Sequence, residues 1–285
     1  MNGVDADRNG VPRQYAAEGL RPQTLVFTLL GRHIAPLDVP VASSTFLEVL
    51  GRLGVSVQAG RSTLTRMVWR GHLERHRVGR RAYFSISDKL RRVLKEGGRR
   101  IFEAPVRDVP DDVWTLLSFS IPESKRADRH SLRTALAWNG FGLLRNGLWI
   151  APGDVDVSAI VAKLDLQDRV EVFSARPSGP TDLQRVVNEA WDLPAIAQQY
   201  RDFIDEWDRA LPPTDEGHLA PQIRLITHWQ QLLVDDPELP PRYLPEDWPA
   251  MEAYELFLRT EAALSPQAHN EFVELLDALD HVPAT

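Results

Sequence analysis

The sequence predicts a multi-domain protein of the α+β class, and three observations along the chain support this prediction. Helical periodicity in residues 22–70 is followed by two short strand-like segments in residues 72–86. Residues 112–173 then follow the order strand, helix, strand, strand, helix, strand, and the chain is helical from Thr181 onward. At 285 residues the chain exceeds the usual size of one domain. The predicted organisation is a disordered tail, an N-terminal domain, a central domain and a C-terminal helical domain, over residues 1–19, 20–105, 106–178 and 179–285.

The composition is that of a globular protein, with 43% hydrophobic and 26% charged residues. No window approaches the roughly 18 uninterrupted apolar residues that a membrane span requires, and the first dozen residues are polar, unlike a signal peptide. The absence of cysteine excludes disulfides, thiolate metal sites and thiol nucleophiles. We expect a soluble, cytoplasmic protein that does not bind membranes.

The net charge of −7 conceals an asymmetry along the chain. Residues 13–105 contain 17 Lys and Arg against 7 Asp and Glu, whereas residues 106–285 contain 15 against 31. A basic module on an acidic body is typical of a DNA-binding protein, because Lys and Arg neutralise phosphates and release counterions. The alternative is a solvated surface with unevenly distributed charge.

Three helices are predicted at the start of the basic region. The first covers residues 22–34, with a proline in its first turn. The second covers residues 43–53, with Thr45 and Glu48 spaced as a capping box and a glycine after its end. The third follows the cap residue Ser56 and runs to about Arg70. The short link between the second and third helices indicates a helix-turn-helix.

The third helix is amphipathic at 100° per residue. Its apolar face is predicted to consist of Val57, Gly60, Leu64, Met67 and Val68. Its polar face carries residues that can reach base edges or phosphates in the major groove of DNA: Gln58, Arg61, Ser62, Thr65 and Arg66. The alternative is an ordinary amphipathic surface helix.

A basic hairpin follows in residues 72–86, with its turn at Val78-Gly79-Arg80. Three arginines near its tip, Arg77, Arg80 and Arg81, are expected to contact the phosphate backbone, which adds affinity without sequence information. The hairpin makes the N-terminal domain a predicted winged helix-turn-helix. Arginines of the next helix, which Ser87 is expected to cap, either continue the phosphate contacts or are solvated.

The runs RPQTLVFTLLGRHI and GVSVQAGRSTLTRMVWRGHLERHRVGRRAYFSIS resemble the amino-terminal winged helix of the PaaX family, repressors of phenylacetate and related aromatic catabolism. This chain departs from the family at Gly60, where relatives usually have a larger apolar residue. A glycine within a helix costs roughly 1 kcal/mol relative to alanine, so this helix is expected to be locally soft. The operator sequence of this chain therefore cannot be inferred from the operators of its relatives.

The central domain is predicted to have the ferredoxin-like βαββαβ order. Its two middle strands flank the turn Arg145-Asn146-Gly147, a strong hairpin signal. The run WTLLSFSIPESKRADRHSLRTALAWNGFGLLRNGLWIAP closely resembles the central domain of the PaaX family, and LITHWQQLLVDDPELPPRYLPEDWP resembles its carboxy-terminal signature. Ser265-Pro266 is expected to open the last helix, with proline at its first position.

The resemblance implies a homodimer that binds palindromic operator DNA and is released by an effector, phenylacetyl-coenzyme A in the namesake group. A coenzyme A thioester needs cations for its phosphates and aromatic rings for adenine or the acyl group. The candidate effector-binding residues are Arg126, Arg129, Arg133, Trp138 and Trp149. The alternatives are a solvated basic stripe above two core tryptophans, or a dimer contact. The linker over residues 103–108 is a candidate hinge between the liganded and free states.

Enzyme signatures are absent: there is no G-x-S-x-G, no H-E-x-x-H, no P-loop and no complete dinucleotide fingerprint. His72 and His76 lack a third metal donor. Asp111 and Asp112, before the first central strand, leave a metal-dependent nuclease as one alternative. A protein-interaction adaptor that does not bind DNA is another. We expect no enzymatic activity, no cofactor and no metal.

Overall fold

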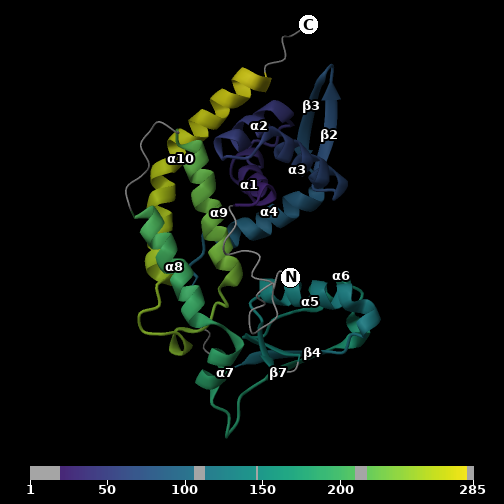
Figure 1. Cartoon of the computed structure of the whole chain (residues 1–285), viewed down its shortest axis with the longest axis vertical. Helices are drawn as coiled ribbons and strands as arrows, with labels where there is room; N and C mark the ends of the chain where they lie inside the picture. Colours follow the sequence, from purple (N-terminus) through teal and green to yellow (C-terminus); the bar gives the residue numbers. More distant parts are fainter. Residues whose placement is uncertain (1–19, 106–112, 146, 209–216, 281–285) are drawn as a thin grey trace, which may run out of the picture. The chain divides into compact units, whose positions relative to one another are not determined.

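The structure is a computed structural model that describes residues 20–105, 113–145, 147–208 and 217–280 (Figure 1). The predicted tail over residues 1–19 lies outside this part of the chain. The chain divides into two compact units. The α1–α4 unit comprises the described residues within 19–103, 203–230 and 254–285, and the β4–β7 unit comprises those within 104–202 and 231–253.

The α1–α4 unit begins with five helical segments: α1 (Pro22–Leu29), the π-helical η1 (Leu30–Ile34), α2 (Ser43–Arg52), α3 (Val57–Trp69) and α4 (Asp88–Ile101). Its antiparallel sheet has the order β1-β3-β2. These strands are β1 (Val41–Ala42), β2 (Leu73–Val78) and β3 (Arg81–Ile86). The hairpin of β2 and β3 directly follows α3 (Figure 1).

Local sequence explains both ends of α3. The Ser56 hydroxyl accepts a hydrogen bond from the Ala59 amide at 3.3 Å and caps α3, as expected. Gly71 ends the same helix with a φ of 68°, a left-handed conformation that glycine adopts without strain. The predicted capping box of α2 is wrong: the N-cap is Ala42, and Thr45 is buried inside the helix.

The hydrophobic core of the α1–α4 unit includes side chains from both ends of the sequence. Leu25, Phe46 and Leu64 represent the buried faces of α1, α2 and α3. Four buried residues of α9 (Leu219–Asp235) and α10 (Ala250–Asp280) complete the same cluster: Leu219, Ile223, Ala268 and Phe272. The basic N-terminal module therefore shares its core with C-terminal helices.

Polar contacts reinforce this packing. Arg32 donates to Oε1 of Glu261 from Nε at 3.0 Å and from Nη2 at 2.8 Å. The amide of Gln222 donates to the same carboxylate oxygen at 3.1 Å, and its carbonyl oxygen lies 2.9 Å from Nε2 of His33. Burial lowers the pKa of His33 from 6.5 to about 4, since a charged imidazole loses its hydration there. A further ion pair joins Arg52 of α2 to Glu271 of α10 at 2.5 Å.

The last helix does not begin at Ser265-Pro266 as expected. Helix α10 is continuous over Ala250–Asp280 and contains Pro266 in its interior. The Ser265 hydroxyl instead accepts a hydrogen bond from Arg32 at 2.5 Å. Packing of α10 against the N-terminal helices thus outweighs the cost of a proline within a helix.

The β4–β7 unit contains a four-stranded antiparallel sheet of order β5-β6-β4-β7. Its strands are β4 (Trp114–Phe119), β5 (Gly142–Arg145), β6 (Leu148–Pro152) and β7 (Val170–Ala175). Helices α5 (Arg126–Trp138) and α6 (Ser158–Lys163) cover one sheet face (Figure 1). Two more helices follow β7: α7 (Leu183–Ala190) and α8 (Leu193–Trp207).

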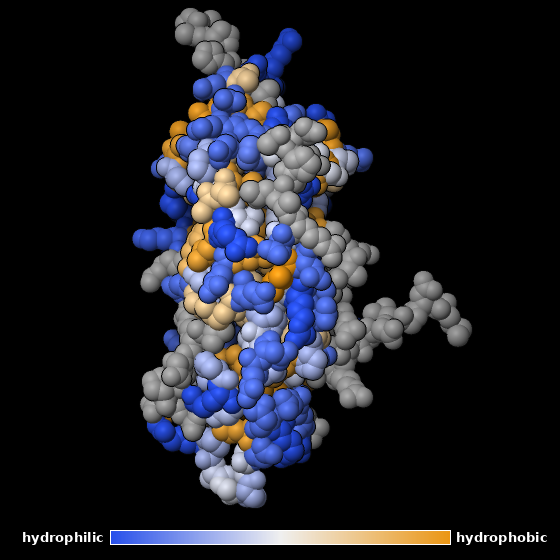
Figure 2. Space-filling model, turned by 90° about the vertical axis from the view of Figure 1, so that its left-hand side faces the viewer, coloured by the Kyte–Doolittle hydropathy of each residue, from blue (hydrophilic) through white to orange (hydrophobic). Residues whose placement is uncertain are grey.

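Each sheet face has its own apolar packing. Leu117, Leu136 and Trp149 belong to the cluster beneath α5 and α6. On the opposite face, a Cβ at Gly142 would lie 2.6 Å from the Trp191 ring, so only glycine allows this close approach. No helix in the described ranges is long and apolar enough to cross a membrane. The face in Figure 2 is mainly hydrophilic, with small separated apolar patches.

Candidate nucleic-acid interface

One face of α3 is exposed and polar. All five residues predicted to read DNA are exposed: Gln58, Arg61, Ser62, Thr65 and Arg66. Gly60, Leu64 and Met67 are buried on the opposite side, as expected. The predicted apolar face needs one correction, since Val57 is exposed and Thr63 is buried instead.

Hydrogen bonds along this face hold its side chains in place. Nη1 of Arg66 donates to Oγ of Ser62 at 2.7 Å, and its Nη2 donates to Oγ1 of Thr63 at 3.1 Å. The Thr65 hydroxyl donates to the carbonyl oxygen of Arg61 at 2.9 Å. The Arg66 guanidinium therefore lies along the helix surface, and these two bonds use two of its five N–H donors.

Gly60 is the point at which α2 approaches α3. A Cβ added there would lie 2.7 Å from Cδ2 of Leu47 and 3.3 Å from Cδ1 of Leu50. Both neighbouring atoms are ends of leucine side chains, so a larger residue at this position requires α2 to repack. This contact accounts for the glycine, at which the sequence departs from the pattern it resembles.

The hairpin beside α3 carries the predicted arginines at its tip. Gly79, with a φ of 59°, and Arg80 form the two-residue turn between Val78 and Arg81. Arg77, Arg80 and Arg81 are exposed. Because paired residues of antiparallel strands share a face, Arg77 (opposite Ala82) lies on the same side as buried Phe84, whereas Arg81 lies on the other side. The three arginines thus do not point in one direction.

Sequence comparison decides the family of this chain. Three sequence models of one family match it in order: PaaX-like protein over residues 21–90, PaaX protein central Cas2-like domain over 107–187, and PaaX-like protein C-terminal domain over 191–274. The chain belongs to the PaaX family. A curated relative, Transcriptional repressor PaaX of Escherichia coli (strain K12), is 28% identical over 261 residues, covering 86% of this chain and 81% of the relative.

A solved structure supports the fold of this PaaX-family chain. The uncharacterized protein Rv0674 from Mycobacterium tuberculosis matches 90% of this chain and 100% of its own chain, with a TM-score of 0.59 and 22% identity. At this identity the likeness concerns the fold alone. The match covers 90% of the chain and therefore extends over most of its elements.

The PaaX-family fold exposes cationic and aromatic residues near α3 that the sequence analysis did not select. Trp69, the last residue of α3, is 86% exposed, and Arg70 and Arg75 are also exposed. Helical spacing is sufficient to place Trp69 on the polar face of α3. Intervals of four, three and four residues separate Gln58, Ser62, Thr65 and Trp69.

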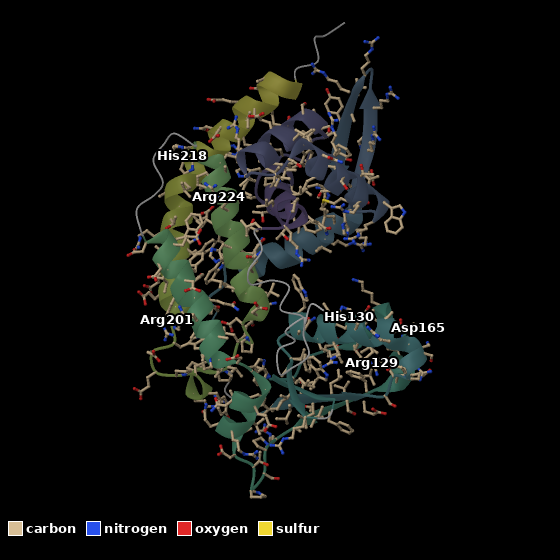
Figure 3. The ribbon with its side chains drawn as sticks, viewed as in Figure 1. Arg129, His130, Asp165, Arg201, His218 and Arg224 are labelled. Carbon is tan, nitrogen blue, oxygen red and sulfur yellow. The ribbon has the colours of Figure 1, made fainter. Side chains whose placement is uncertain are left out.

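The candidate effector residues are only partly brought together. Arg126, Arg129 and Arg133 follow one another on α5, and Figure 3 labels Arg129 there. Arg129 forms a hydrogen-bonded ion pair with Glu123. Trp138 is exposed but lies about 140–180° around the helix from Arg129 and Arg133 at 100° per residue. Trp149 is 1% exposed in the core beneath α5.

The predicted lack of a metal site is consistent with the histidine positions, although it remains an expectation. Nε2 of His76 lies 2.6 Å from the Ser85 hydroxyl on the neighbouring strand. Among the residues that the structure describes, no group of three or more His, Asp or Glu is arranged to hold a metal ion. Asp111 and Asp112, and residues 106–108 of the candidate hinge over residues 103–108, lie outside the described residues.

Proposed function

We propose that this PaaX-family chain is a transcriptional repressor that binds double-stranded operator DNA through α3 and the β2–β3 hairpin. The observation that carries the proposal is the exposed face of α3, on which Gln58, Ser62 and Arg66 stand beside a basic hairpin. In this proposal α2, the turn at Gly54 and α3 form a helix-turn-helix, and the hairpin is its wing. The name of the E. coli relative, a transcriptional repressor, supports a regulator rather than an enzyme.

The chemistry of the two elements divides their roles. Arginine and glutamine on α3 can form bidentate hydrogen bonds with guanine and adenine edges in the major groove. Arginines of the hairpin act on phosphates, which add affinity for any sequence. The acidic remainder of the chain, with 31 Asp and Glu against 15 Lys and Arg over residues 106–285, is repelled by the duplex and leaves the basic module as the contact.

The wider assembly is proposed on the same basis. The proposed DNA-binding domain covers residues 20–105, and the proposed ferredoxin-like central domain covers residues 106–178. The proposed effector-binding or dimerisation domain covers residues 179–285. The strand order β5-β6-β4-β7 supports the central assignment, because it places the first and third strands of the βαββαβ unit side by side in the middle. A homodimer would present two α3 helices to half-sites about one helical turn, or a multiple of it, apart.

Replacing Arg66 by alanine is expected to weaken binding to the preferred DNA sequence by roughly 5- to 150-fold, because a bidentate base contact contributes about 1–3 kcal/mol. Gel shifts on the DNA upstream of the chain's own gene, against an unrelated duplex, measure this effect.

Arg77→Ala should weaken binding to both duplexes equally. It should also reduce the slope of log affinity against log salt concentration by about one.

Lys163→Ala serves as the control for Arg66→Ala, because Lys163 is an exposed cation on α6, far along the chain from the basic module. It should bind DNA like the wild type. If the wild type binds both duplexes with equal affinity, or neither of them, a protein-interaction adaptor replaces the repressor as the function.

We further propose that a small aromatic acyl-coenzyme A, or a related aromatic acid, releases the DNA. A typical coupling free energy of about 1–3 kcal/mol predicts a decrease in operator affinity of roughly 5- to 150-fold when the effector binds. A panel of aromatic and aliphatic acids and their coenzyme A esters, added to the gel shift, identifies the class. Arg126→Ala combined with Arg133→Ala should abolish the response and leave affinity without effector unchanged; a retained response places the effector elsewhere.

A further inference from the structure

Trp69 is an unusual surface residue. It is 86% exposed, whereas the next most exposed large hydrophobic residue in the described ranges, Phe173, is 59% exposed. An aromatic side chain such as tryptophan can bury about 150–250 Å² of surface, and this burial is energetically favourable. Aromatic residues are also enriched where proteins contact partners. Its exposure in the isolated chain therefore indicates that a partner covers it.

The position of Trp69 identifies the face on which that partner lies. Trp69 follows Gln58 by eleven residues, Ser62 by seven and Thr65 by four, so at 100° per residue all four side chains lie within about 60° of one another. The opposite face of α3 is fixed by buried Thr63, Leu64 and Met67. Around the helix axis, Trp69 thus lies near the middle of the proposed DNA-reading face. Along the axis, it lies at the C-terminal end of α3.

The surroundings of Trp69 are cationic. Arg66 precedes it by three residues, and Arg70 follows it directly, where Nη1 donates to Oε1 of Gln23 at 3.0 Å. Nζ of Lys89, on α4, donates to the carbonyl oxygen of Arg70 at 3.4 Å. A second copy of the chain packed on Trp69 about a two-fold axis would bring the same cations of both copies together, which is unfavourable. A polyanion with apolar surface between its charges fits this arrangement.

We propose that Trp69 is a DNA contact that determines specificity, with its indole ring covering apolar surface of the duplex beside the base contacted by Arg66 and a phosphate held by Arg70. Duplex DNA offers two such surfaces next to its phosphates, the C5 methyl group of thymine and the deoxyribose ring. This inference rests on the proposed DNA-binding function and adds a contact at the end of α3 that hydrogen bonding by the polar residues does not supply.

The test uses the full chain and a duplex enriched from a random-sequence library by the wild type. Trp69→Ala is expected to lose about tenfold or more in affinity for this duplex, because it exposes the apolar area that the indole covers. Trp69→Phe should lose less, since it keeps part of that area. Phe173→Ala, which removes an aromatic side chain that is 59% exposed on β7, is the matched control and should bind like the wild type.

Two further arms separate the outcomes. Thermal unfolding of Trp69→Ala should match the wild type, because an exposed side chain contributes little to stability. Replacing single thymines by uracil should weaken binding by the wild type but not by Trp69→Ala if the indole covers a thymine methyl. If no uracil duplex differs, the ring covers deoxyribose, which carries no sequence information, and the assignment of specificity to Trp69 is overturned.

Failure of this inference differs from failure of the proposed function. If the wild type enriches no duplex, the DNA-binding proposal is wrong. If the wild type binds its duplex and Trp69→Ala binds equally well, only the role of Trp69 is wrong. Light scattering completes the test: a wild-type dimer that Trp69→Ala converts to a monomer would make Trp69 a contact between copies and overturn the DNA assignment.

Discussion

Phe272→Ala is expected to lower the free energy of unfolding of the α1–α4 unit by about 3–5 kcal/mol, although Phe272 lies near the end of the chain and far in sequence from the basic module. Its ring is fully buried, belongs to the same cluster as Leu25 and Leu64, and lies 5.1 Å from the His33 ring between centroids. Removing it leaves a cavity between α10 and the N-terminal helices. Urea unfolding followed by tryptophan fluorescence measures the change.

Leu258→Ala is the matched control on the same helix, because the Leu258 side chain is 36% exposed whereas Phe272 is fully buried. It should cost less than about 1 kcal/mol. A cost for Phe272→Ala as small as that of Leu258→Ala would show that α10 does not complete the core of the N-terminal module.

The stability of the α1–α4 unit is expected to fall by about 3 kcal/mol as the pH is lowered from above 6.5 to about 4, because of His33. Its folded-state pKa, about 4, lies below its ordinary value of 6.5, so the unfolded chain binds the proton first. The full contribution is therefore present above pH 6.5 and is lost as the pH falls toward 4. Below pH 4 both states are protonated and the loss is complete.

Urea unfolding at a series of pH values checks this prediction. The groups that act on the His33 pKa besides burial are Gln222, which raises it, and Arg32, His269 and Glu271 with smaller effects. His33→Gln should remove most of the pH dependence between 6.5 and 4. His76→Gln, at an exposed histidine of β2, should retain it. An equal pH dependence in wild type and His33→Gln would assign the effect to other groups.

Much of the N-terminal module could be predicted from the sequence because its determinants are local. Ser56 caps α3 through an amide three residues away, and Gly71 ends it by adopting a left-handed conformation. Gly79 lies in the turn between the two predicted strands, which pair as an antiparallel hairpin. The exposed face of α3 follows from helical periodicity. Val57 is expected on the buried face but is exposed, because it is the first residue of the helix and faces solvent, and Thr63 is buried instead.

Several features escaped prediction because they depend on residues distant in sequence. Pro266 predicts a helix start, yet α10 passes through it, since its buried face packs on the N-terminal helices. Trp149 is a candidate ligand-binding residue in the sequence but fills the core beneath α5, which agrees with the alternative of a core tryptophan. No role is predicted for Trp69 from the sequence, and its side chain is exposed because the opposite side of α3 is the buried one.

The sequence by itself determined the order of helices and strands, the basic charge of the first third and the polar face of α3, because caps, turns and periodicity act over a few residues. Only the tertiary structure decided that α9 and α10 complete the core of the basic module, with His33 and Arg32 bonded to their side chains. The physical reason is that burial depends on which surfaces meet. Residues 200 positions apart can bury one another, and no local pattern records that contact.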